Sequence, residues 1–146
     1  MGCGTDYKQG WINVDRGNCD CDVQHDIENY PWPFDDGVVE VVYMQHVLEH
    51  LDPNSYGKLV AELHRVLKPG GIFQAISPHA TSDNFNTDPT HKWRLTTRTF
   101  DYVDPSKALY ENGVIYGWGD YKFHVESSVI ECGENGPNIA HLLKKS

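Results

Sequence analysis

Two histidines of the chain each follow closely on an apolar run of the kind that forms strands. His46 comes after residues 38–44, and His79 comes after residues 72–76. Imidazole titrates near neutral pH, so a histidine just past a strand is a suitable general base for a reaction at an oxygen nucleophile. A hydrogen-bonded structural histidine is the alternative for both. We therefore take His46 and His79 as the candidate catalytic residues.

His46 also opens a second pattern, because residues 46–50 read His-Val-Leu-Glu-His. This H-x-x-E-H spacing fits one class of zinc hydrolase, in which two histidines one helical turn apart bind the metal beside a glutamate base. Asp52-Pro53 closes the segment, which leaves room for barely two helical turns after the preceding strand. We therefore expect no bound metal here and keep a zinc hydrolase as the least favoured alternative.

The residues around this segment have the pattern of a strand, a helix and a second strand. Residues 38–44 are nearly all apolar and β-branched, which is typical of a strand buried on both faces of a parallel sheet. Asp52-Pro53 signals a helix start, and apolar residues then recur at helical spacing. The Lys-Pro-Gly-Gly sequence at 68–71 ends the helix before residues 72–76 form the next strand. Such a unit places its two strands side by side and parallel, with both candidate histidines at the same edge.

The C-terminal part of the chain predicts a β-hairpin. Residues 121–131 alternate in part between apolar and polar side chains, and residues 139–143 form a second run of this kind. Between them, residues 133–137 are rich in the glycine, asparagine and proline that form turns. We expect these two strands to be antiparallel and to form one edge of the sheet.

The composition is acidic. Lys and Arg number 12 against 21 Asp and Glu, a formal charge of −9 over 146 residues, which argues against duplex nucleic acid and anionic membranes as partners. The four cysteines lack the density of a disulfide scaffold; Cys19, Cys21 and His25 have metal-like spacing but no evident fourth ligand. We expect a single cytoplasmic domain with a small-molecule substrate, and neither a nucleic acid nor a membrane as its partner.

Five segments share one further pattern. They are a glycine-rich turn (2–4), a short apolar segment ending in a carboxylate (10–15), Pro-Phe-Asp-Asp-Gly (33–37), a strand end followed by His-Val-Leu-Glu-His-Leu (43–51), and Arg-Val-Leu-Lys-Pro-Gly-Gly (65–71). In this order and spacing they resemble small class I S-adenosylmethionine-dependent methyltransferases. The resemblance covers nearly the whole chain. It implies an α/β, Rossmann-like fold: a doubly wound, mostly parallel sheet with an antiparallel C-terminal hairpin, and S-adenosylmethionine across the carboxyl ends of its strands.

The resemblance also implies a set of cofactor-binding residues. Glycines in the first turn let the backbone approach the ligand, and a carboxylate ending the second strand can accept both ribose hydroxyls in bonds of about 1.5–3 kcal/mol each. Asp26 matches the position that meets the adenine amino group in the family. A solvated turn aspartate is the alternative for Asp15 and Asp26. The full expected set is Gly2, Cys3, Gly4, Asp15, Asp26, Ile27 and Gln45.

The chain departs from the family at the first strand. In the family this strand lies in the middle of the sheet, just before the glycine turn; here Met1 stands where its last residue would be. Without it, the strands on either side lose their shared neighbour and expose backbone groups. We therefore expect residues 1–146 to be an N-terminally truncated domain that is poorly soluble, molten or strand-exchanged on its own.

Residues 78–104 are long, polar and rich in turn formers. They follow the carboxyl end of the second predicted strand, so we expect them over the mouth of the cleft, where long ordered insertions commonly bind substrate. His91 and Arg94 are the candidate substrate-binding residues. The alternative is that residues 78–104 form a solvent-exposed loop that does not bind substrate.

These expectations combine into one function. The resemblance implies methyl transfer from S-adenosylmethionine to a small molecule or sugar, with oxygen as the expected acceptor atom. A sulfonium methyl group is already electrophilic, so positioning and removal of water supply much of the catalysis. The alternative from another class is a catalytically degenerate binding module with the methyltransferase fold, which the absent strand favours.

Overall fold

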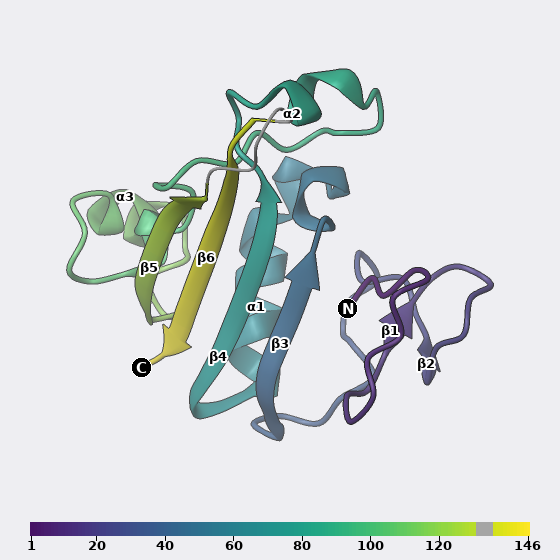
Figure 1. The fold of residues 1–146 in the computed structure, drawn as a ribbon. Coiled ribbons are helices and arrows are strands. Elements are labelled where there is room, and N and C mark those ends of the chain that lie inside the picture. The colour runs from purple at the N-terminus through teal and green to yellow at the C-terminus, as the bar shows by residue number, and fades with distance from the viewer. Residues whose placement is uncertain (131–135) are drawn as a thin grey trace.

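The computed structural model describes residues 1–130 and 136–146 and contains two β-sheets. The larger sheet has the strand order β3-β4-β6-β5, and the smaller sheet pairs β1 with β2 in parallel (Figure 1). The strands are β1 Val14–Asp15, β2 Val23–Gln24, β3 Val39–Gln45, β4 Leu67–Pro78, β5 Phe123–Ile130 and β6 Asn138–Lys145. The helices are η1 Leu48–His50, η2 Pro53–Ser55, α1 Tyr56–Val66, α2 Asp83–Thr87, η3 Asp101–Val103 and α3 Tyr110–Ile115. None of these helices is long and apolar enough to cross a membrane.

β3, α1 and β4 form the predicted strand–helix–strand unit. β3 and β4 are parallel neighbours. The Asp52 carboxylate accepts a hydrogen bond from the Asn54 amide at 2.9 Å and so caps the helical region at the predicted position. α1 lies along the sheet and buries its apolar stripe, in which Leu59 and Leu63 are fully buried (Figure 1). The prediction for this unit is confirmed.

The C-terminal strands form the predicted antiparallel pair. β5 and β6 pair in register from Phe123–Lys145 to Ile130–Asn138, and β6 also pairs antiparallel with β4. β5 is therefore the outer strand and β6 lies inside the sheet. The turn predicted at 133–137 falls largely on residues 131–135, which lie outside the described residues.

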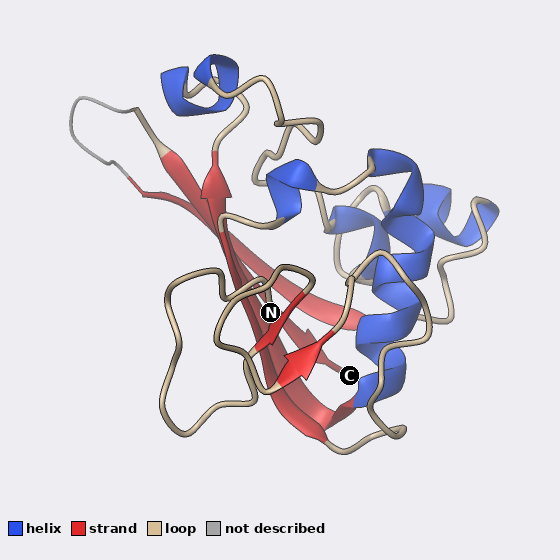
Figure 2. Cartoon of the chain, turned by 90° about the vertical axis from the view of Figure 1, so that its right-hand side faces the viewer, coloured by secondary structure: helices blue, strands red, loops and turns tan. Residues whose placement is uncertain are grey.

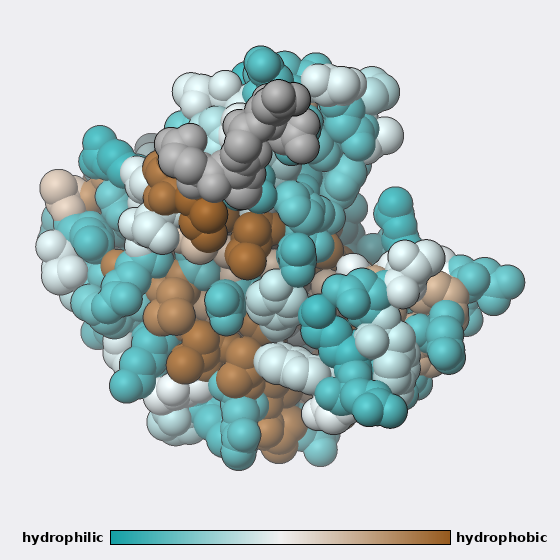
Figure 3. Space-filling model, in the orientation of Figure 1, coloured by the Kyte–Doolittle hydropathy of each residue, from teal (hydrophilic) through white to brown (hydrophobic). Residues whose placement is uncertain are grey.

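The helices that pack on the larger sheet lie on one of its faces (Figures 1 and 2). Val42 and Met44 of β3 are buried, whereas Val41 and Tyr43, which point to the opposite face, are only half-buried. The expectation that residues 38–44 are buried on both faces is therefore wrong, because in the described part of the chain no helix covers the second face. Apolar side chains gather over this face in the space-filling view (Figure 3).

A groove of about 530 Å³ separates β1 from β3. Apolar side chains line it from both sides, among them Val14 of β1 and Val41 of β3. The edge of β3 that borders it pairs with no strand in the described residues. At one end of the groove the Met1 amino group donates to the Tyr43 carbonyl at 2.7 Å, and the Gly2 amide donates to the Val14 carbonyl at 2.7 Å. Residues 1–2 thus join the two sheets, with an open strand edge beside them.

Candidate active site

A cleft of about 640 Å³ lies where β1, β2 and β3 end. Its walls come from Gly2, from residues 15–16 and 25–28 after the two short strands, and from two later segments, which contribute His46, Val47, His50 and Leu51 after β3 and Pro89, Thr90 and Lys92 from a loop. The volume is within the range of sites that hold small organic ligands. Cofactor sites of open α/β sheets lie in this position, at the carboxyl ends of the strands.

Asp15 is held rigidly at the end of β1. Its Oδ2 accepts the Gly4 amide at 2.8 Å and its Oδ1 accepts the Gly17 amide at 2.7 Å. Burial acts to raise the pKa of Asp15, but the backbone amides of Gly17, Gly4 and Arg16 outweigh it and hold the pKa below its ordinary value. The carboxylate is therefore ionised at neutral pH, and each oxygen has acceptor capacity left for a ligand.

The glycine turn packs tightly on the segment after β3. Gly2 has a φ of +66°, and a Cβ there would lie 2.5 Å from a methyl group of Val47. Both the backbone conformation and the contact require glycine at this position. The turn therefore lies directly against the cleft wall, as the sequence predicts for a loop that approaches a ligand.

The far end of the cleft is formed after β2. Asp26 accepts the Glu28 amide at 3.0 Å through Oδ1, and its other oxygen lies 3.9 Å from the Arg16 guanidinium. Ile27 is buried, and its carbonyl accepts the indole N–H of Trp32 at 2.9 Å. An apolar side chain beside a carboxylate suits a flat heteroaromatic ring that carries an amino group.

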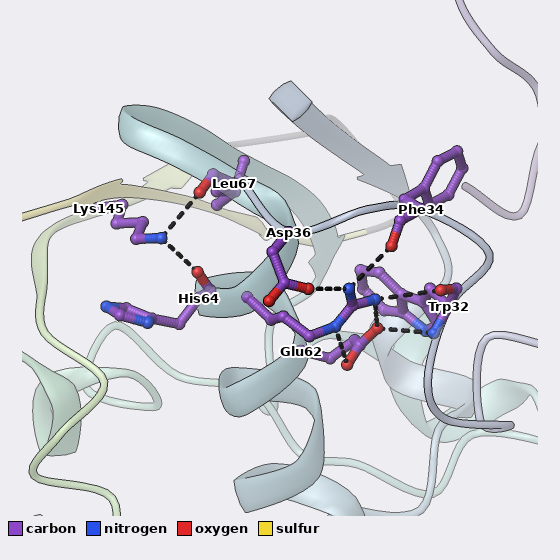
Figure 4. Close-up of polar contacts among 8 residues, drawn as sticks. Trp32, Phe34, Asp36, Glu62, His64, Leu67 and Lys145 are labelled. Carbon is purple, nitrogen blue, oxygen red and sulfur yellow. Dashed lines mark hydrogen bonds and ion pairs between the residues drawn. The ribbon is translucent and has the colours of Figure 1, made fainter. Parts of the chain in front are cut away.

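Charged residues of α1 hold Trp32, and with it the loop that contains Ile27, in place. The Trp32 amide donates to Glu62 Oε1 at 2.6 Å, and the Arg65 guanidinium donates to Glu62, Asp36 and the carbonyls of Trp32 and Phe34 (Figure 4). Glu62 is almost fully buried and the Arg65 side chain is 27% exposed, so the Glu62 side of this pair is shielded from water. α1 thus holds the loop that positions Ile27, although none of these helix residues lines the cleft.

His46 stands at the mouth of the cleft directly after β3. Its backbone has a φ of +53°, and its amide continues the strand ladder by donating to the Ile76 carbonyl at 2.8 Å. Its Nδ1 lies 3.2 Å from Oε1 of Glu49, and this hydrogen bond raises the pKa of His46 against the opposing effect of burial. A carboxylate therefore orients the imidazole, as in many acid–base sites.

The loop at 88–93 docks on η1 through the backbone. The Glu49 carbonyl accepts the amides of Lys92 and Trp93 at 2.7 and 3.0 Å. This brings the ring of His91 to within 4.7 Å of the ring of His50, in an edge-to-face arrangement. The predicted position of this loop beside the cleft agrees with the structure, in which Pro89, Thr90 and Lys92 line the wall.

Four of the expected site residues lie away from the cleft lining. Gln45 is exposed and accepts the Tyr43 hydroxyl at 2.8 Å; strand alternation turns it from the side that would face a ligand. His79 bonds Thr81 through Nδ1 at 2.9 Å and pairs with Leu95. Arg94 stacks on a phenylalanine ring at 5.0 Å, and the thiol of Cys3 faces a backbone carbonyl. The structure does not bring Gln45, His79 and Arg94 together with the other candidates, whereas the Cys3 thiol lies within 4.8 Å of an Asp15 carboxylate oxygen.

The remaining candidates lie beside the cleft or behind its wall. Gly4 does not line the cleft, but its backbone amide donates to Asp15 and so helps to position that carboxylate. His91 lies behind the wall, with Nδ1 3.0 Å from the Phe85 carbonyl. His25 bonds the Asn29 carbonyl at 2.8 Å, so it is not part of a site with the cysteines. Burial, followed by Asp15, raises the pKa of Cys19 to about 12, which keeps this thiol protonated.

Sequence reasoning missed Glu49 and Glu62 as residues that organise the cleft. A signal exists for Glu62, because it is a carboxylate on the apolar stripe of α1, three residues before an arginine. Glu49 has the weaker signal of a charged residue between apolar Leu48 and the buried Leu51.

The sheet order, and a cleft at its strand ends with a carboxylate after β1, define an α/β domain of the Rossmann-like class. Comparisons with known proteins narrow this class. A family model described as "Methyltransferase domain" matches residues 2–75. An uncharacterised methyltransferase of Synechocystis sp. is 35% identical over 51 residues, which are 35% of this chain and 24% of that protein.

Solved structures agree on the fold. A SAM-dependent methyltransferase from Archaeoglobus fulgidus matches with a TM-score of 0.52 at 23% identity, over 77% of this chain and 62% of that chain. A second match is the 1,6-didemethyltoxoflavin-N1-methyltransferase of Burkholderia thailandensis, solved with bound 1,6-didemethyltoxoflavin and S-adenosylhomocysteine. Its TM-score is 0.53 at 13% identity, over 85% of this chain and 50% of that chain. The chain belongs to the class I S-adenosylmethionine-dependent methyltransferase family. It spans about a quarter of the curated relative and half to two thirds of these structures.

Proposed function

We propose that the cleft binds S-adenosylmethionine and that the protein transfers its methyl group to an oxygen of a small molecule or sugar. The observation that carries the proposal is the convergence of Asp15, Ile27 and His46 on one cleft. Of these, Asp15 and Ile27 are expected cofactor residues, and His46 is the expected base.

The residues present fit the cofactor. Asp15 has an ionised carboxylate with free acceptor capacity for the two ribose hydroxyls, and Gly2 is a position that only glycine can occupy without a clash. Ile27 and Leu51 offer apolar surface for adenine, with Asp26 beside them for its amino group. When bound, the cofactor supplies an electrophilic methyl group.

His46 takes the proton of the acceptor hydroxyl in this proposal. Glu49 orients the ring through Nδ1, which leaves Nε2 directed to other partners. The loop with Thr90 and Lys92 forms the acceptor side of the cleft and excludes water from it. An oxygen acceptor needs such a base, whereas a more nucleophilic nitrogen or sulfur acceptor does not.

Calorimetry with S-adenosylmethionine tests the binding part. The test uses a chain with about ten strand-forming residues added before Met1 (the extended chain), because the open edge of β3 leaves the 146-residue chain prone to pairing with other copies. We expect Asp15→Asn to weaken binding about tenfold or more, because it removes the charge from two hydrogen bonds to ribose. Asp6→Asn is the matched control, since Asp6 is an exposed aspartate of the same N-terminal segment that does not line the cleft. Equal affinity in wild type and Asp15→Asn would remove Asp15 from the site.

Formation of S-adenosylhomocysteine, assayed against a panel of sugars and small hydroxyl compounds, tests the transfer part. We expect His46→Ala to lower kcat while the dissociation constant of the cofactor stays the same, as for a residue that acts in the transition state. Cofactor binding without product for any acceptor would instead indicate a binding module.

A further inference from the structure

Glu49 is a buried carboxylate with one oxygen unused. Its side chain is 0% exposed; Oε1 faces His46, and Oε2 has no hydrogen-bond partner among the described residues. A buried carboxylate oxygen without a partner is costly, so such oxygens in folded proteins are normally bonded to a donor or a cation.

Two imidazoles lie next to this carboxylate. Glu49, His50 and His91 each offer a ligand atom, and these three atoms lie within 4.8 Å of one another. The grouping is built by the backbone, because the Glu49 carbonyl accepts the amides of Lys92 and Trp93 and so holds the loop at 88–93 against η1.

The hydrogen bonds of the two rings assign their tautomers when they are neutral. Nδ1 of His91 faces the Phe85 carbonyl at 3.0 Å; a carbonyl only accepts, so this nitrogen carries the hydrogen. The Thr90 hydroxyl donates to Asp88 at 2.6 Å, so it accepts from Nδ1 of His50 at 3.1 Å. Both histidines therefore present a lone pair on Nε2, the arrangement that second-sphere hydrogen bonds give to metal-binding histidines.

A negative group faces one of these lone pairs. Oδ2 of Asp88 lies 3.7 Å from Nε2 of His91. A carboxylate and an imidazole lone pair repel each other unless a cation or a proton lies near both. The buried Glu49 carboxylate, with its unpaired oxygen, and the two histidines thus gather one ligand atom each within 4.8 Å of one another.

We propose that Glu49, His50 and His91 bind one divalent transition-metal ion, beside the Asp88 carboxylate that faces His91. Two imidazole nitrogens and a carboxylate are a donor set that suits Zn²⁺. Donors around tetrahedral zinc lie about 3.4 Å apart for bonds of about 2.1 Å, so small side-chain rotations close the cluster around an ion.

This site differs from the H-x-x-E-H arrangement weighed in the sequence. There His46 and His50 would both be ligands, whereas here His46 bonds Glu49 and the second histidine comes from a loop about 40 residues further on. The site borders the cleft through His50 and Thr90, so a bound ion lies beside the acceptor side.

Zinc titration of the extended chain after chelator treatment, in competition with a chelating dye, tests the proposal. We expect one Zn²⁺ per chain and a loss of affinity of about a hundredfold in His91→Gln and in His50→Gln, since each variant removes a ligand. His124→Gln is the matched control, because His124 is an exposed histidine of β5 beside two carboxylates and away from the cluster. Unchanged affinity in both ligand variants would overturn the proposal.

Cobalt substitution separates this site from the cysteines, because Cys3, Cys19 and Asp15 also lie within 4.8 Å of one another. We expect visible bands of tetrahedral Co²⁺ that are lost in His91→Gln, without the intense near-ultraviolet thiolate band. A thiolate band that disappears in Cys19→Ser would assign the metal to the cysteines and contradict the proposal.

Thermal unfolding gives a second readout of the same site. Circular dichroism of each variant shows whether it is folded. We expect zinc to raise the Tm of wild type and to leave the Tm of folded His91→Gln unchanged, because only a chain that binds the ion is stabilised by it. An equal rise in both would contradict the proposal. Neither the cobalt spectrum nor the Tm depends on S-adenosylmethionine, so failure of the methyl-transfer proposal does not affect them.

Discussion

Single residues connect parts of this molecule that are far apart in the sequence. Glu49 joins the end of β3 to the loop at 88–93, through its side chain on one side and its carbonyl on the other. Sequence reasoning found the strand, the histidine and the loop as separate features. It could not place His91 beside His50, because that contact depends on two backbone hydrogen bonds between distant segments.

His141 is the buried residue from which we expect a pH effect. It is fully buried on β6 with Nδ1 2.8 Å from the Ser127 hydroxyl, and its Nε2 has no partner among the described residues. Burial, with a smaller effect of His79, lowers its pKa to about 4. The folded protein therefore binds the proton more weakly than the unfolded chain, where histidine titrates near 6.5.

The contribution of neutral His141 to the free energy of unfolding is therefore fully present above pH 6.5 and is lost as the pH falls toward 4. The loss amounts to about 3 kcal/mol at most, from 1.36 kcal/mol per pKa unit. Urea unfolding of the extended chain at a series of pH values measures it, and we expect His141→Asn to flatten the dependence in this window. His124→Asn, at an exposed position of the neighbouring strand, should leave it as it is. The same slope in wild type and His141→Asn would assign the acid sensitivity elsewhere.

At the scale of elements, the unit β3–α1–β4 was predictable because its boundaries are local. Asp52 and Pro53 start the helical region, and α1 ends at Val66, just before the Lys-Pro-Gly-Gly sequence at 68–71, so no distant contact is needed to place its ends. The burial of β3 was not predictable in this way, since it depends on what covers each face of the sheet. Likewise, the hydrogen bonds that join Trp32 to Glu62 and Arg65 were not predictable, because they form only when the helix and the loop are folded together.

The hydrogen bonds that join Trp32 to Glu62 and Arg65 predict that two ion pairs differ in how much they contribute to the free energy of unfolding. We expect Glu62→Gln or Arg65→Met to lower the free energy of unfolding by about 3 kcal/mol, because each leaves a shielded charged partner and backbone groups without their bonds. Lys68→Met breaks the exposed pair with Glu40 and should cost less than about 1 kcal/mol. Urea denaturation of the three variants in the extended chain measures this, and equal costs would show that the burial of Glu62 carries no special weight.

At the scale of the whole molecule, the groove between β1 and β3 leaves the two sheets without a strand pairing between them among the described residues, and residues 1–2 bridge them at one end. The groove lies where the sequence analysis expected an absent strand, between the strands that would be its neighbours. An open edge and an apolar groove are sites for pairing with another chain. We therefore predict that the 146-residue chain alone is poorly soluble, molten or strand-exchanged.

A fusion tests this prediction directly. We expect about ten added residues before Met1, with a valine- and isoleucine-rich strand pattern, to fill the groove and give a monomer with a sharp unfolding transition. A glycine–serine extension of the same length is the matched control and should change nothing. Sedimentation and urea unfolding measure both properties. A monomeric mass and a sharp transition for the chain without any addition would contradict the prediction.

The hydrogen bond between the Trp32 indole and the Ile27 carbonyl has an optical consequence. Indole emission depends on the hydrogen bond of its N–H and on the field around the ring, and Ile27 lines the cleft. A ligand that shifts this segment changes the light that Trp32 emits, so the cleft carries an intrinsic fluorescent reporter. The other three tryptophans, Trp11, Trp93 and Trp118, do not line the cleft and can be replaced by phenylalanine to isolate the signal. Occupancy can then be followed in solution without a label.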